Sequence, residues 1–107
     1  MAKRKPSARA VRREQDRAAE KLTRDLERLA RIEPGGAPDR PIALDSASQV
    51  EVAAAAIPCP RCRGEVRVEE HAAEVVGGAR LRVARVVCPM CRARRSLYFR
   101  LAEATLN

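Results

Sequence analysis

Two short stretches, Cys59-Pro60-Arg61-Cys62 and Cys88-Pro89-Met90-Cys91, constrain this chain more than any other part of it. In each stretch the spacing of the two thiols lets one tight turn bring both sulfur atoms to the same ion, at about 2.3 Å. Two such pairs supply the four ligands of a tetrahedral site. The sequence therefore predicts one structural Zn²⁺ held by Cys59, Cys62, Cys88 and Cys91.

The segment between the cysteine pairs predicts an antiparallel β-hairpin. Residues 65–69 and 80–83 each alternate apolar and charged side chains with a period of two, and Gly77-Gly78 between them is a hairpin-turn signal. Residues 96–101 predict a further strand. Because neighbouring strand residues point to opposite faces, one face of this strand is expected to enter a small core. The residues on that face are Leu97, Phe99 and Leu101.

Residues 50–102 resemble the zinc-ribbon family, whose metal-binding turns, called knuckles, have the form Cys-Pro-x-Cys. The resemblance implies a small β-ribbon held by one zinc ion and the four cysteines. It selects no function, because zinc ribbons occur in transcription, translation and recombination proteins and as accessory modules of enzymes. Many of these knuckles have a glycine directly after the second cysteine, where this chain has Arg63 and Arg92. Non-glycine residues resist a positive φ, so the geometry of both turns is in question.

Two other uses of four cysteines are an iron site and a thiol redox centre. Rubredoxins bind iron with the same four thiolates, but they are typically acidic and aromatic-rich. This chain carries a formal charge of +8, one Phe, one Tyr and no Trp. A thioredoxin-like centre requires its cysteine pair at a strand-to-helix junction, whereas both pairs here adjoin hairpin patterns. Zinc is therefore preferred, and a redox or iron electron-transfer protein is the minor alternative.

Catalysis is not expected. A closed four-cysteine site has no coordination position for water, and no nucleophile, base and orienting carboxylate stand in a recognisable pattern. No small-molecule substrate is evident either. His71 is the only histidine, and because four cysteines already complete the shell, we expect it on the surface or behind the ligands.

The chain divides into three parts: a basic tail and helix (1–33), a linker (34–48) and a zinc-ribbon domain (49–107). The helix is expected from Ala8 to Glu33, because this segment is rich in Ala, Arg, Glu and Leu and ends at Pro34-Gly35-Gly36. Ser7 suits its N-cap. The fold class is thus small α+β, an amphipathic N-terminal helix joined by a Pro/Gly linker to an antiparallel zinc β-ribbon.

Residues 49–56 fit two structures. Ser48 and Glu51 form the pattern of a capping box, which favours a short helix through the alanines that follow. Val50 and Val52 alternate with Glu51 just before the first knuckle, which favours a strand. We expect the strand, because the first strand of a zinc ribbon enters the metal loop at this place.

The sequence predicts a non-catalytic zinc-binding module with a nucleic-acid-associated or regulatory role. The positive charge favours an anionic partner, nucleic acid first. Arginines follow phosphates, and an exposed aromatic side chain stacks on bases. Tyr98 is the aromatic residue expected to be exposed, because it alternates with the core positions. The candidate nucleic-acid-binding residues are Arg80, Arg82, Arg92, Arg94, Arg95, Tyr98 and Arg100. The basic N-terminus, including Lys3, Arg4 and Lys5, is either a phosphate-binding arm or a solubilising tail.

The N-terminal helix has an apolar face that suits a coiled coil or a docking helix, and its alternative is an arm against its own ribbon. The candidate partner-binding residues are Leu22, Leu26 and Leu29. If they bind a partner, the protein is an interaction adaptor with the ribbon as a platform. No apolar run is long enough for a membrane span and no secretory leader is visible, so a cytoplasmic location without membrane contact is expected.

Overall fold

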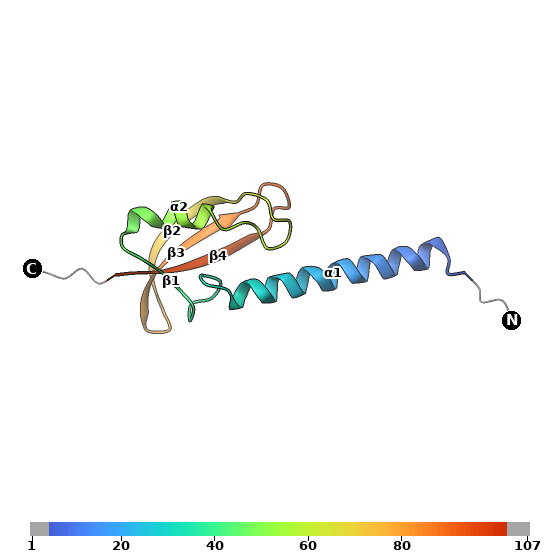
Figure 1. Ribbon diagram of the computed structural model, residues 1–107, viewed down its shortest axis with the longest axis horizontal. Helices are drawn as coiled ribbons and strands as arrows, with labels where there is room; N and C mark the ends of the chain where they lie inside the picture. The colour runs from blue at the N-terminus through green and yellow to red at the C-terminus, as the bar shows by residue number, and fades with distance from the viewer. Residues whose placement is uncertain (1–4, 103–107) are drawn as a thin grey trace, which may run out of the picture.

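The computed structural model describes residues 5–102 and shows a long helix followed by a small mixed sheet (Figure 1). The sheet has the strand order β1-β4-β3-β2, in which only the β1–β4 pair is parallel. The small α+β class is therefore confirmed, and the antiparallel arrangement holds for the other pairs. The elements are α1 (Ala8–Ile32), β1 (Ile42–Leu44), the 3-10 turn η1 (Ala47–Gln49), α2 (Val50–Ala55), β2 (Arg67–Val76), β3 (Ala79–Val87) and β4 (Arg94–Leu101).

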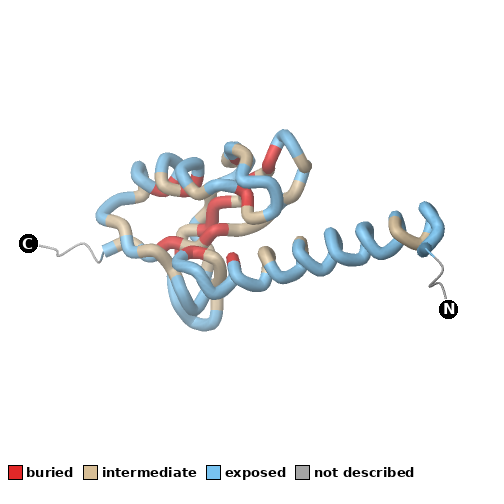
Figure 2. Tube along the Cα trace, turned by 45° about the vertical axis from the view of Figure 1, so that its right-hand side comes forward, coloured by how far each residue is buried: buried red, intermediate tan, exposed pale blue. Residues whose placement is uncertain are grey.

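Helix α1 begins and ends as its sequence predicts. The Ser7 hydroxyl accepts a hydrogen bond from the backbone N–H of Ala10 at 3.0 Å, which caps the first turn. After Ile32 the chain turns so tightly that a side chain at Gly36 would overlap the carbonyl oxygen of Ala30. Ala30, near its C-terminal end, is the one buried residue of the helix, and the N-terminal part of α1 extends away from the sheet (Figure 2). Lys3 and Arg4 of the expected basic arm lie outside the described residues.

Strands β2 and β3 form the predicted hairpin. Val76 pairs with Ala79, and Gly77 and Gly78 between them have φ values of 56° and 81°. Two positive φ values are what a tight turn that matches the twist of the strands requires, and glycine adopts them without strain. The register shifts between Val68 and Glu70, where a β-bulge accommodates one extra residue.

The expected strand at residues 49–56 is wrong: residues 50–55 form helix α2. The Gln49 side chain accepts hydrogen bonds from the backbone N–H groups of Asp45 and Ser46, which stabilises the turn that leads into α2. A capping box is present, but Ser46 and Gln49 form it at the start of η1, and the predicted pair Ser48 and Glu51 does not. Alanine is the best helix former, and the helix buries its residues four apart, Val50 and Ala54.

Strand β1 lies inside the segment expected to be a linker. Ile42–Leu44 pairs in parallel with Phe99–Leu101 of β4. Before β1, the loop is tied to the same strand by a 2.9 Å hydrogen bond from the backbone N–H of Tyr98 to the carbonyl oxygen of Gly35. Residues 34–48 therefore contribute to the sheet as well as joining α1 to it.

The core lies between α2 and one face of the sheet, toward the end that carries the four cysteines. Phe99 and Leu97 are completely buried, as predicted, and Leu101 packs against them from a half-buried position. Cys59 and Cys88 belong to the same cluster, so the first cysteine of each knuckle is part of the core. The other buried members are Val50, Ala54, Val66, Ala84 and Val86. No helix within residues 5–102 is both long and apolar enough to cross a membrane.

Candidate metal centre and basic surface

The structure brings the four cysteines of the two knuckles together at one end of the sheet. Their sulfur atoms all lie within 4.8 Å of one another. Cys59 Sγ is 3.6 Å from Cys91 Sγ, and Cys62 Sγ is 3.3 Å from Cys88 Sγ. A tetrahedral ion with metal–sulfur bonds of about 2.3 Å requires sulfur–sulfur distances of about 3.8 Å, so these four side chains can hold one metal ion.

The two knuckles have the same backbone geometry. Arg63 N–H donates to Cys59 C=O at 2.8 Å, and Arg92 N–H donates to Cys88 C=O at 2.7 Å. Arg63 and Arg92 have φ values of 64° and 63°, in the left-handed region. The turns therefore keep the glycine-type conformation although arginine occupies the position, at a cost of roughly 1–2 kcal/mol for each residue.

Hydrogen bonds within the turns set the acidity of the thiols. Backbone N–H groups of Cys91 and Met90 donate to Cys88 Sγ and, against burial, lower the pKa of Cys88 to about 7. The backbone N–H of Gly64 also lowers the pKa of Cys62. Hydrogen bonding with Cys88 and partial burial outweigh it, so the pKa of Cys62 rises to about 12. Without a metal, the Cys62 thiol is therefore protonated near neutrality, and an ion has to displace this proton.

The candidate nucleic-acid residues separate into two groups. Arg94, Arg95 and Tyr98 line a cavity near the metal end of the sheet. The hairpin-end arginines, which are Arg80, Arg82 and Arg100, line a hollow at the opposite end. Arg92 lines neither the cavity nor the hollow, and it directly follows the second knuckle.

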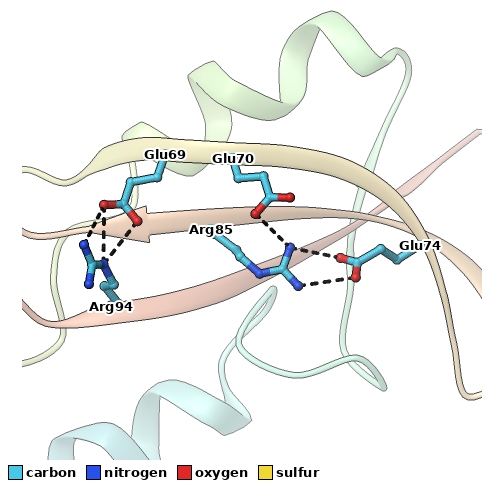
Figure 3. A network of polar contacts seen from close by, with 5 residues as sticks. All are labelled: Glu69, Glu70, Glu74, Arg85 and Arg94. Atoms are coloured by element: carbon cyan, nitrogen blue, oxygen red, sulfur yellow. Dashed lines mark hydrogen bonds and ion pairs between the residues drawn. The ribbon is translucent and has the colours of Figure 1, made fainter.

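Ion pairs occupy some of the arginines on the sheet. Arg94 donates two hydrogen bonds to the Glu69 carboxylate, from Nη2 at 3.1 Å and from Nε at 3.2 Å (Figure 3). Arg85 forms ion pairs with Glu74 at 3.3 Å and with Glu70 at 3.6 Å (Figure 3). Its hydrogen bond to Glu74 raises the pKa of the Arg85 guanidinium. Among the described residues, no carboxylate pairs with the hairpin-end arginines, which leaves them available to an anion.

The cavity near the metal end also contains residues that were not predicted. Arg31 comes from the last turn of α1, and Arg61 comes from the first knuckle, where its Nε lies 3.4 Å from Glu27 Oε1. These residues are far apart in the sequence and follow no shared motif. Only the packing of the end of α1 beside β4 brings them to one place.

His71 lies on β2 beneath α2 and apart from the cysteine cluster. Its Nδ1 is 3.9 Å from Glu51 Oε1 on α2, and its side chain is largely covered. Its Nε2 is buried and has no hydrogen-bond partner among the described residues. It therefore contacts the helix that covers the sheet.

The candidate partner residues on α1 are mostly open to solvent. Leu22 is 59% exposed and Leu29 is 50% exposed, while Leu26 is half-buried, one helical turn before the buried Ala30. Ile32 continues the exposed stripe at 56%. The helix therefore packs one side near its C-terminus against the sheet and leaves two of the three predicted leucines uncovered.

Comparison with protein-family models, with curated proteins and with solved structures found no match to this chain. The functional conclusions therefore rest on the site and the surface themselves.

Proposed function

We propose that this protein is a non-catalytic zinc-ribbon module that binds nucleic acid. The observation that carries the metal assignment is the set of four sulfur atoms within 4.8 Å of one another. Four thiolates in a tetrahedral arrangement suit zinc or iron, and the basic, aromatic-poor surroundings favour zinc. Four protein ligands fill the coordination shell, so the ion would stabilise the fold and leave no position for a reacting water.

Charge supports nucleic acid as the partner. Zinc with four thiolates carries a net charge of −2, which reduces the formal charge of +8 to about +6. The hairpin-end arginines lie at the end of the sheet away from the metal, and two of them, Arg80 and Arg100, are exposed. Phosphate contacts of this kind provide affinity without selecting a sequence.

The test is the binding of a fluorescent single-stranded oligonucleotide to the zinc-loaded protein as a function of salt concentration. If the hairpin-end arginines contact phosphates, changing all three to Gln reduces the slope of log affinity against log salt by about 2. A variant with Arg12, Arg13 and Arg17 changed to Gln removes the same charge from α1 and is the matched control. Equal losses in the two variants would show that total charge, and not this surface, drives binding.

Self-association through α1 is a second candidate function. Leu22 and Leu29 are exposed and seven residues apart, and Ile32 follows three residues later, which is the spacing of a coiled-coil seam. A second copy of the chain is the partner that this spacing fits. Sedimentation of the zinc-loaded protein should then show a dimer that Leu22→Asp with Leu29→Asp dissociates, and a monomer at all concentrations would exclude it.

A further inference from the structure

A cavity of about 350 Å³ lies where the end of α1, the first knuckle and β4 meet. Among residues 5–102, no other strand pairs with the outer edge of this part of β4, because β1 covers only Phe99–Leu101. The end of α1 and the first knuckle form the other walls of the cavity. Its volume is near the lower limit for a small-molecule site, about 300 Å³, which is room for one small ligand.

The polar part of the cavity is cationic. Four arginines and one carboxylate line it. Arg61 is paired with that carboxylate, Glu27, and Arg94 is paired with Glu69. Within residues 5–102, the remaining two arginines, Arg31 and Arg95, have no ion-pair partner.

Arg95 is the cation that most requires an acceptor. Its Nε is buried and has no hydrogen-bond partner among the described residues. Burial lowers its pKa, while the charges of Cys59 and Glu33 act against that shift without forming an ion pair. An arginine remains charged in proteins, so an unsatisfied buried donor on a guanidinium is costly and favours an anionic acceptor.

Apolar and aromatic side chains also line the cavity. Val66, Val86 and Ala93 line it together with Tyr98, whose backbone is fixed by its hydrogen bond to Gly35. A ring with a flat apolar face can pack on tyrosine and valine while an attached anion reaches the guanidinium groups. The lining thus offers both kinds of contact that a nucleotide uses, guanidinium groups for the phosphate and apolar or aromatic side chains for the base.

We propose that this cavity binds one nucleoside phosphate, with the phosphate at Arg95 and Arg31 and the base against Tyr98. This inference rests on the proposed nucleic-acid function and specifies where a single nucleotide is held. The competing role of Arg95 is to offset the charge of the metal thiolates, because Cys59 also lines the cavity. If Arg95 binds the nucleotide, loss of its guanidinium lowers nucleotide affinity. If Arg95 offsets the charge of the thiolates, the same loss lowers metal affinity.

The experiment is calorimetric titration of the full-length zinc-loaded protein with adenosine 5′-monophosphate, adenosine and inorganic phosphate. We expect the nucleotide to bind at least about tenfold more tightly than either fragment, because it contacts the arginines and the apolar or aromatic side chains at the same time. Arg95→Gln should weaken nucleotide binding about tenfold. Arg31→Gln should weaken it as well, and because Arg31 is exposed this variant does not endanger the fold. The matched control is Arg28→Gln, an exposed arginine of the same helix outside the cavity.

The outcomes separate the inference from the function on which it rests. Equal affinity for the nucleotide and adenosine, or nucleotide affinity unchanged in both Arg95→Gln and Arg31→Gln, would overturn the cavity assignment. A lower zinc affinity in Arg95→Gln with unchanged nucleotide binding would assign Arg95 to the metal site instead. If oligonucleotides still bind through the hairpin-end arginines, the proposed function survives that result. Nucleotide binding without oligonucleotide binding would refute the function and retain the cavity.

Discussion

Val50→Ala and Val52→Ala form a matched pair that tests whether residues 50–55 are helical. The two positions carry the same side chain and are two residues apart. In a strand they would point to the same face, and in helix α2 they point in different directions. Val50 is 0% exposed and Val52 is 74% exposed, so the helix predicts opposite sensitivities for the same substitution.

The expected magnitude follows from burial and helix propensity. Removing two carbon groups from a buried valine costs about 1.6 kcal/mol in transfer free energy, and the cavity left behind adds about 1 kcal/mol if the site does not collapse. Alanine returns about 0.5 kcal/mol of helix propensity at either position. Val50→Ala should therefore lower the free energy of unfolding by about 2 kcal/mol, while Val52→Ala should leave it unchanged or raise it by up to about 0.5 kcal/mol.

The assay is urea unfolding followed by circular dichroism, with free zinc held constant because metal binding contributes to stability. The slope of the transition should be the same in both variants, so that the difference in midpoint reports stability alone. Similar destabilisation by the two substitutions would refute the helix and restore the strand that the sequence suggests.

Three further outcomes are expected. Cys88→Ser should remove the cooperative unfolding transition, because it takes one ligand from the metal and one member from the core; a native spectrum without bound metal would contradict this. Arg63→Gly with Arg92→Gly should raise the free energy of unfolding by about 0.5 kcal/mol at each position, since relief of the left-handed strain exceeds the extra entropy of glycine. Arg67→Gly in β2 is the control and should lower the free energy of unfolding by about 0.5–1 kcal/mol. If all three positions respond alike, the two knuckle arginines are not strained. Apparent zinc affinity, measured by chelator competition, should rise with pH, because the Cys62 thiol with a pKa of about 12 is protonated near neutrality and must release its proton to bind the ion; a flat profile would argue against thiolate ligation.

Features that depend on near neighbours in the chain could be predicted without the structure. The paired cysteines, the Gly77-Gly78 turn and the Ser7 cap each use residues within a few positions of one another, and the structure places all of them as expected. The alternation in β4 likewise identified Leu97 and Phe99 as core residues. Local spacing is sufficient here because a tight turn, a cap and a strand face are each defined within a single element.

Other features depend on what lies across the fold. The spacing of Val50 and Val52 in so short a segment fits a strand as well as a helix. The packing of residues 50–55 on β2 and β3 favours the helix. Strand β1 exists because Phe99–Leu101, far along the chain, offers a free edge to Ile42–Leu44. Arg31 and Arg95 meet in one cavity only after α1 has packed beside β4. The sequence by itself thus determined the ligands, the hairpin and the long helix, whose interactions are local. The tertiary structure decided α2, β1 and the grouping of the arginines, because long-range contacts select among conformations that local preferences leave nearly equal in free energy.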